Sequence, residues 1–421
     1  MRLLKKYTGL SIVVIVNMAI QFLFQWYVLT YIGVGTETDV LFGTMAIPQF
    51  ILLVLSGSLT LVLVPLFSSL SGEAFKQTGW DITQIVGLSF IALAFIMFIT
   101  AKWCIKFLLP GFTGQSYQLA IELFSIQLIA MVLSSLLSIV WSLHNAKENY
   151  YKMEITSIAA GVIAVVVLHF SFKQLGIYAA AWASVLRVLL QFLLLCRILG
   201  PYKRLHIHSG NIIYTRKKLR PLILGNMYYK TGALADQYLS STSKKGDLTL
   251  LSLAQQIYTA INSIAVKVIV NTMVPILAKA YTNKEKEKFQ QIFYQRLIVA
   301  LLLSVLVTMG LLFFGKWLLG IVFVFKKIDL SDVSNFWWIM VILSGFFSGG
   351  ILGSVISSAF YAKGDTKTPT RINTILFTIY LPLKFLAFSL YGITGLAISI
   401  STYYILNVVV QFIFFQKSRF A

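Results

Sequence analysis

Charged residues are scarce in this chain of 421 residues: only 12% are Asp, Glu, Lys or Arg, whereas 58% are hydrophobic. An average globular protein has about twice this charge density, so a water-soluble protein is excluded. Acidic residues are the scarcest kind, with 14 Asp and Glu against 35 Lys and Arg, and the formal net charge is +21. On a soluble protein this charge would indicate a nucleic-acid partner, but in a membrane protein it indicates basic cytoplasmic loops. We therefore expect no nucleic-acid partner.

Cysteine and catalytic motifs are also nearly absent. Cys104 and Cys196 cannot make a disulfide framework, and the topology below places them on opposite sides of the bilayer. The run Gly310–Lys316 has the start of a phosphate-binding loop, but Trp317 follows where that loop requires Ser or Thr. Because no hydroxyl, thiol or carboxylate constellation has catalytic spacing either, we predict that the chain is not an enzyme and holds no metal or cofactor. A coupling ion, Na⁺ or H⁺, is left open.

Long apolar runs are what the sequence has in abundance. A helix needs about 20 apolar residues to cross the hydrocarbon core, so runs of this length predict transmembrane helices. The fold class predicted is an all-α integral membrane protein with twelve transmembrane helices. The twelve runs are 9–33, 39–69, 84–105, 117–141, 155–171, 177–198, 221–242, 248–279, 291–315, 335–361, 373–390 and 394–416.

The basic residues predict the orientation of these helices. With the amino terminus in the cytoplasm, the cytoplasmic segments contain 23 of the 35 Lys and Arg, and the outer segments contain 8. Cytoplasmic loops of membrane proteins carry such an excess, so both termini are expected inside the cell. The run 9–33 follows basic residues as a signal peptide would, but we expect it to be retained as the first helix. Four basic residues remain inside the membrane.

A weak internal repeat divides the chain into two halves of six helices. Val64-Pro65 matches Val274-Pro275, Ala146-Lys147 matches Ala362-Lys363, and Gln191-Phe192 matches Gln411-Phe412, in the same order along the chain. Transporters built from such repeats bind substrate near the membrane midplane between the halves, and one half rocks against the other. We predict an N-terminal lobe at 1–198, a basic cytoplasmic linker at 199–220 and a C-terminal lobe at 221–421, around a central cavity.

The four intramembrane cations are the first candidates for a binding site: Arg187, Lys230, Lys267 and Lys384. A charge at the bilayer centre costs roughly 2.5–3.5 kcal/mol on insertion scales, so such residues usually face a cavity or a partner. All four lie at a similar depth and predict a positive chamber that suits a phosphate or diphosphate. The alternatives are a structural ion pair between Lys230 and Asp236, and interfacial or carbonyl contacts for Arg187 and Lys384.

Polar residues at helical spacing form further candidates, because positions i, i+4 and i+8 share one helix face. A row of such polar residues along one helix face, which we call a stripe, would line a wet cavity if the helices at 9–33, 221–242 and 248–279 face each other. The alternative is that these residues form hydrogen bonds between helices. Asp39 and Asp236 are the acidic residues among these candidates. The predicted substrate-binding residues besides the cations are Asn17, Gln21, Gln25, Asp39, Asp236, Gln256 and Asn271.

Two loop motifs resemble those of the lipid II flippase (MviN-type) family, which belongs to the multidrug/oligosaccharidyl-lipid/polysaccharide exporter superfamily. The first is Ile-Gly-Val-Gly-Thr-Glu-Thr-Asp-Val-Leu-Phe at 32–42, followed by Ile47-Pro48 and Val64-Pro65; the second is Ser-Ala-Phe-Tyr-Ala-Lys-Gly-Asp-Thr-Lys-Thr-Pro at 358–369. The segment from Asp236 to Pro275 is similar to the family's seventh and eighth helices. The resemblance implies two six-helix lobes around a cationic cavity that passes lipid-linked sugars outward.

This chain departs from the family at the cavity arginines. Where lipid II flippases carry arginines in the first, second and eighth helices, the corresponding regions have Met18, Phe24, Leu52 and Gln256. The cavity cations are therefore expected at Lys230 and Lys267 instead.

The leading hypothesis is a flippase for an undecaprenyl-diphosphate-linked oligosaccharide, a precursor of surface polysaccharide. Its partners would be membrane lipids, this lipid-linked diphosphate oligosaccharide and a glycan polymerase or glycosyltransferases. One alternative is lipid II transport for peptidoglycan with a rearranged site. Another is a cation-coupled multidrug exporter, which predicts more intramembrane acids than Asp39, Glu122 and Asp236. The last alternative is a non-transporting scaffold that recruits glycan enzymes.

Overall fold

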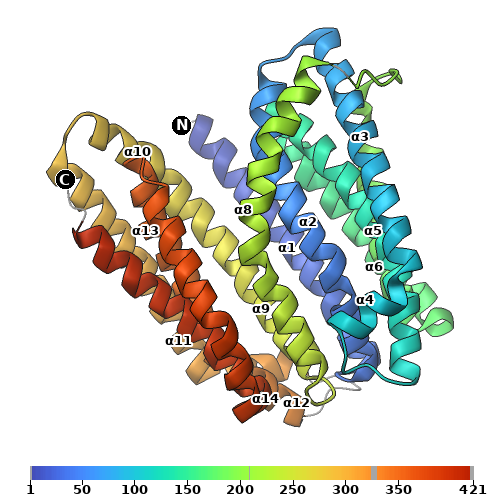
Figure 1. Cartoon of the computed structure of the whole chain (residues 1–421). Coiled ribbons are helices and arrows are strands. Elements are labelled where there is room, and N and C mark those ends of the chain that lie inside the picture. The colour runs from blue at the N-terminus through green and yellow to red at the C-terminus, as the bar shows by residue number, and fades with distance from the viewer. Residues whose placement is uncertain (1, 208, 324–329, 418–421) are drawn as a thin grey trace. The chain divides into compact units, whose positions relative to one another are not determined.

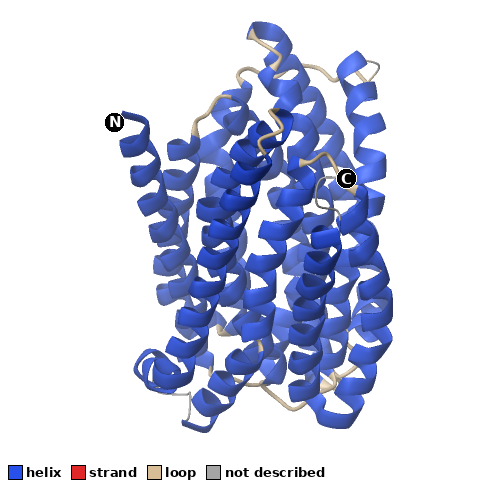
Figure 2. Ribbon diagram, turned by 90° about the vertical axis from the view of Figure 1, so that its left-hand side faces the viewer, coloured by secondary structure: helices blue, strands red, loops and turns tan. Residues whose placement is uncertain are grey.

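The protein folds almost entirely into helices (Figure 2). The structure is a computed structural model and describes residues 2–207, 209–323 and 330–417. The α-helices are α1 (Arg2–Ile32), α2 (Thr36–Ser68), α3 (Gly72–Ile99), α4 (Ala101–Leu108), α5 (Gln115–Ala146), α6 (Tyr150–Leu175), α7 (Ile177–Leu195), α8 (Gly210–Ser241), α9 (Asp247–Ala265), α10 (Asn271–Thr282), α11 (Lys286–Phe323), α12 (Leu330–Ile342), α13 (Ser344–Ala362) and α14 (Lys367–Lys417). Two short segments complete them, the 3₁₀ turn η1 (Cys196–Leu199) and the π-helical turn η2 (Val266–Val270).

The predicted all-α membrane fold is confirmed. Ten helical stretches of the described chain are long and apolar enough to cross a membrane, and α8 is not one of these ten. The last stretch, α14, joins two of the predicted runs: Gly392 between them has a non-helical conformation with φ of +56°. The count of twelve transmembrane helices and the cytoplasmic position of both termini stay predictions.

Several predicted runs are interrupted where the sequence alone shows no break. The run 248–279 is divided into α9, η2 and α10, and the run 335–361 is divided into α12 and α13. The run 84–105 belongs to α3 and α4, and α3 begins much earlier, at Gly72. Hydropathy does not register these breaks because the residues on both sides are apolar.

Large apolar side chains cover the outer faces of these helices. Phe107 on α4 is 77% exposed, and Phe313 on α11 is 76% exposed. Soluble proteins rarely expose continuous apolar surface of this kind, so these faces are suited to lipid.

The chain divides into two compact units, Met1–Gly246 and Asp247–Ala421 (Figure 1). Unit 1 contains all of α8, which packs along α2, whereas the predicted C-terminal lobe begins at 221, inside that helix. The lobe and linker assignment therefore stays a prediction that rests on topology. In unit 1, α2 packs against α5, and a core of fully buried side chains joins them, including Leu63, Phe67 and Leu143.

In unit 2, α13 packs closely along α14. A Cβ atom added to Gly349 would lie 2.7 Å from the carbonyl carbon of Tyr404, so a larger side chain would push the two helices apart. Gly349 therefore permits the close packing of these two helices. At Gly353 the same atom would make an ordinary contact of 3.6 Å.

The internal repeat has a structural counterpart at two helix ends. At the end of α5, Asn149 donates its N–H to the carbonyl of His144 (3.0 Å) and Glu148 donates to Asn145 (3.0 Å). At the end of α13, Asp365 donates to Phe360 (3.0 Å) and Gly364 donates to Tyr361 (2.9 Å). Both ends are Schellman motifs, and their left-handed residues Glu148 (φ +56°) and Gly364 (φ +80°) follow the matched Ala-Lys pairs.

The lysines of the matched pairs also make similar contacts. Lys147 lies over the ring of Phe75, 4.6 Å from its centroid, and Lys363 lies over the ring of Phe289 at 5.6 Å. Phe75 lies in the first turn of α3, the helix after α2, and Phe289 lies in the first turn of α11, the helix after α10. The two units therefore repeat both a helix end and a cation–π contact, which supports the repeat proposed from the sequence.

Candidate substrate site

The amide stripe of α1 is engaged with α6. Asn17 is buried and donates a hydrogen bond to the Glu154 carboxylate (2.7 Å), while Ser157 donates to the Asn17 carbonyl oxygen (3.0 Å). Gln21 donates to the same oxygen at 3.3 Å. These contacts match the alternative in which the stripe joins helices. Glu154 and Ser157 were not predicted from the sequence, because nothing in their spacing marks them as partners of a residue 137 and 140 positions away, respectively.

The remaining amide candidates are Gln25, Gln256 and Asn271. Gln25 on α1 and Gln256 on α9 are both partly exposed. The side chain of Asn271 lies outside the described residues, so its predicted substrate contact stays a prediction.

The acidic candidates of unit 1 are buried. Asp39 is 5% exposed and accepts a hydrogen bond of 2.6 Å from the backbone N–H of Gly246. Gly246 has a φ of +91°, which favours glycine, so this bond fixes the loop that ends α8 onto the start of α2. Asp236 on α8 is 7% exposed. Asp39 thus has a clear structural role in joining two elements of unit 1.

The two cations of unit 1 differ from these acids. Lys230 on α8 is exposed, and within the described chain no ion pair joins it to Asp236. Arg187 on α7 is partly buried, and we find no hydrogen bond or ion pair between it and any described residue. A cation at membrane depth without a protein partner is expensive unless a cavity or ligand compensates it. Both residues therefore remain candidates for an anionic ligand.

The two cations of unit 2 have opposite surroundings. Lys267 lies in the π-helical turn η2 and is exposed. Single π-helical turns inside longer helices are frequent at functional sites, because they shift the direction of the side chains. Lys384 on α14 is only 1% exposed and lies over the ring of Tyr380, 4.7 Å from its centroid. Lys267 is thus exposed, whereas Lys384 is buried.

Of the four predicted cations, Arg187 and Lys230 belong to unit 1, and Lys267 and Lys384 belong to unit 2. The common chamber expected for these cations stays a prediction.

Solved structures of two kinds of transporter share the fold of this chain. An inward-closed structure of lipid II flippase MurJ aligns with a TM-score of 0.84 at 18% identity, over 97% of this chain and 87% of that one. An inward-facing multidrug resistance MATE transporter of the MOP superfamily aligns with a TM-score of 0.76 at 15% identity, over 96% and 98% of the two chains. The chain therefore has the fold of these transporters.

The family follows from the sequence comparisons. The family model "Lipid II flippase MurJ" matches residues 28–420, so the chain belongs to the lipid II flippase MurJ family. Lipid II flippase MurJ of Burkholderia cenocepacia is 23% identical over 412 residues, covering 91% of this chain and 78% of the relative. A probable lipid II flippase MurJ of Buchnera aphidicola subsp. Acyrthosiphon pisum is 24% identical, covering 95% and 81%. The chain is a multi-pass flippase of the bacterial inner membrane for a lipid-linked precursor.

Proposed function

We propose that this protein moves lipid II, the lipid-linked precursor of peptidoglycan, from the inner to the outer leaflet. The observation that carries the proposal is the family match over residues 28–420, which spans both units. The leading hypothesis from the sequence was a surface-polysaccharide precursor, and lipid II was the alternative. The family match favours that alternative.

The exposed lysines Lys230 and Lys267 are the proposed ligands of the substrate's diphosphate. The diphosphate of the substrate would bind Lys230 and Lys267, because ammonium groups donate charge-assisted hydrogen bonds to phosphate oxygens. Arg187 lacks a partner in the described chain and is a third candidate for the same anion. Binding that requires residues of both units would couple the substrate to movement of one unit against the other.

The membrane potential provides a driving force that requires no ATP. The potential is negative inside, and each elementary charge that crosses it changes the free energy by about 2.3 kcal/mol per 100 mV. The outward movement of two negative phosphate charges therefore lowers the free energy. A coupling ion, Na⁺ or H⁺, is part of the same proposal. No residue of the described chain is assigned to such an ion.

A surface-polysaccharide precursor remains the second candidate, because one set of residues favours it. Met18, Phe24, Leu52 and Gln256 replace the arginines expected in a lipid II flippase, and this change suits a different head group. The glycan polymerase and glycosyltransferase partners belong to this candidate alone.

Complementation distinguishes the two candidates. We expect expression of this chain to restore growth and wall synthesis in cells depleted of their own lipid II flippase. The matched control is the same chain with Lys230→Glu and Lys267→Glu, which should not rescue. Failure of the wild-type chain, at normal membrane abundance and in cells that it supplies with surface polysaccharide, would favour the second candidate.

A further inference from the structure

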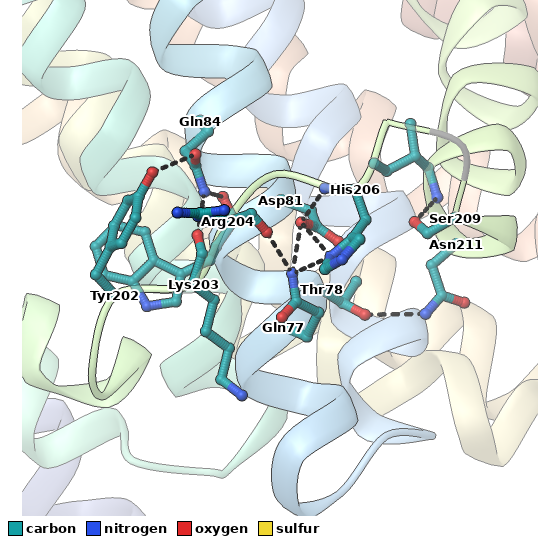
Figure 3. Close-up of polar contacts among 12 residues, drawn as sticks. Gln77, Thr78, Asp81, Gln84, Tyr202, Lys203, Arg204, His206, Ser209 and Asn211 are labelled. Carbon is teal, nitrogen blue, oxygen red and sulfur yellow. Dashed lines mark hydrogen bonds and ion pairs between the residues drawn. The ribbon is translucent and has the colours of Figure 1, made fainter.

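A polar cluster fixes the segment between α7 and α8 onto α3 (Figure 3). At its centre is Asp81, which is 1% exposed. One carboxylate oxygen of Asp81 accepts hydrogen bonds from the backbone N–H of His206 (2.9 Å) and from the side chain of Gln77 (2.9 Å). Gln77 also donates to the carbonyl of Arg204 (2.8 Å). The basic segment is therefore held against α3 rather than extended into solvent.

The cluster continues into the first turn of α8. Asn211 donates a hydrogen bond to Thr78 (2.9 Å), and Ser209 caps the helix by accepting from the N–H of Ile212 (3.4 Å) (Figure 3). Gln84, one helical turn beyond Asp81, donates to the carbonyl of Lys203 (2.9 Å). These bonds fix where α8 begins relative to α3.

Beside this cluster, α2, α3 and α8 enclose an apolar pocket of about 500 Å³, which we call the α8 pocket. Its walls on α2 and α3 include Leu59, Ile82 and Val86, which also belong to or pack against the hydrophobic core of unit 1. The volume falls within the roughly 300–1,000 Å³ of typical ligand sites. The α8 pocket is therefore large enough for a hydrocarbon chain.

One face of α8 lines the pocket and brings two positive charges to it. The lining positions include Ile212, Arg216 and Ile223, at helical spacing, with Arg220 one turn after Arg216. Both arginines are exposed, and no described carboxylate forms an ion pair with either. Two unpaired guanidinium groups at the edge of an apolar pocket are complementary to a molecule with a hydrocarbon tail and a phosphate.

We propose that the α8 pocket binds an anionic phospholipid of the surrounding membrane. An acyl chain lies between α2, α3 and α8, and the lipid phosphate accepts hydrogen bonds from Arg216 and Arg220. A lipid fits better than a free anion because α2 and α3 are membrane-crossing helices and the pocket walls are apolar. Basic pockets between transmembrane helices on the cytoplasmic side are suited to lipid head groups, and these arginines lie in the predicted cytoplasmic segment.

Lipid binding to the purified full chain tests this proposal. Phosphatidylglycerol is titrated into the detergent-solubilised protein, and bound lipid is counted by native mass spectrometry, with phosphatidylcholine as the uncharged comparison. We expect one saturable phosphatidylglycerol site. Arg216→Gln with Arg220→Gln should weaken it roughly 10- to 30-fold. The charge-matched control, Lys217→Gln with Lys218→Gln, lies outside the pocket lining and should change affinity by less than about threefold.

Two further measurements test the tail and the source of the phosphate. Ile85→Trp fills the pocket and should weaken phosphatidylglycerol binding with both arginines intact, and millimolar inorganic phosphate should not displace the lipid. The proposal is overturned by equal binding of phosphatidylcholine, by equal losses in the arginine and lysine pairs, by displacement with inorganic phosphate, or by unchanged binding in a monodisperse Ile85→Trp protein. If that variant aggregates, the arginine and lysine pairs decide.

Discussion

At the scale of single residues, the polar groups inside the membrane fall into two kinds. Asn17 and Asp39 are buried and hydrogen-bonded within unit 1, so they join elements. Lys230 and Lys267 are exposed and suit a ligand. The sequence predicted that all of these residues are unusual, because polar groups in apolar runs are costly. It could not separate the two kinds, since the partners of Asn17 lie far away in the chain.

Asp365 offers a test at this scale outside the membrane spans. Its carboxylate accepts the backbone N–H groups of Lys367 (3.1 Å) and Thr368 (3.0 Å) at the start of α14. Burial opposes ionisation of Asp365, but hydrogen bonds from the side chain and backbone of Thr368 and from the backbone of Lys367 outweigh burial and lower its pKa. We expect Asp365→Ala to lower the free energy of unfolding by about 1 kcal/mol, measured by denaturation in detergent, whereas Asp365→Asn keeps the cap.

The pH dependence of the same residue follows from the lowered pKa. A carboxyl group whose pKa is lowered by folding stabilises the protein above its unfolded pKa, and this contribution is lost as the pH falls through the folded pKa. The stability difference between wild type and Asp365→Ala should therefore shrink in acid. A difference that grows in acid would show that Asp365 does not act as an ionised cap.

At the scale of helices, the periodic and apolar pattern was sufficient to place most elements. All twelve predicted runs lie in helices, because an apolar segment in lipid must satisfy its own backbone hydrogen bonds. The breaks were not predictable in the same way. The π-helical turn at Lys267 and the division before Ser344 depend on packing, and hydropathy does not encode packing.

The two Schellman motifs provide a matched pair of substitutions. Gly364 has a φ of +80°, so Gly364→Ala places a Cβ in a left-handed conformation and should cost about 1 kcal/mol. Glu148 already carries this cost at a φ of +56°, so Glu148→Gly should be neutral or stabilising by up to about 1 kcal/mol. Thermal melting of the two variants in one detergent measures both effects. Equal destabilisation by both substitutions would contradict equivalent helix ends.

At the scale of the whole molecule, the charge of +21 has several separate roles. Most basic residues belong to the predicted cytoplasmic rim, and two of them, Arg216 and Arg220, line the α8 pocket. The family and the membrane fold were both predictable from the sequence, because loop motifs and apolar runs are local features. The partners of the buried polar side chains were not, since they depend on how helices far apart in the sequence meet.

The central claim is that Lys230 and Lys267 bind the diphosphate of a lipid-linked substrate. The most direct measurement is rescue of lipid II flippase-depleted cells by Lys230→Glu with Lys267→Glu, at membrane levels equal to wild type. The matched control reverses two other exposed charges, Lys244→Glu with Lys245→Glu. We predict that the first double variant gives no rescue and that the control rescues as wild type does. Full rescue by the Lys230 and Lys267 variant would contradict the account.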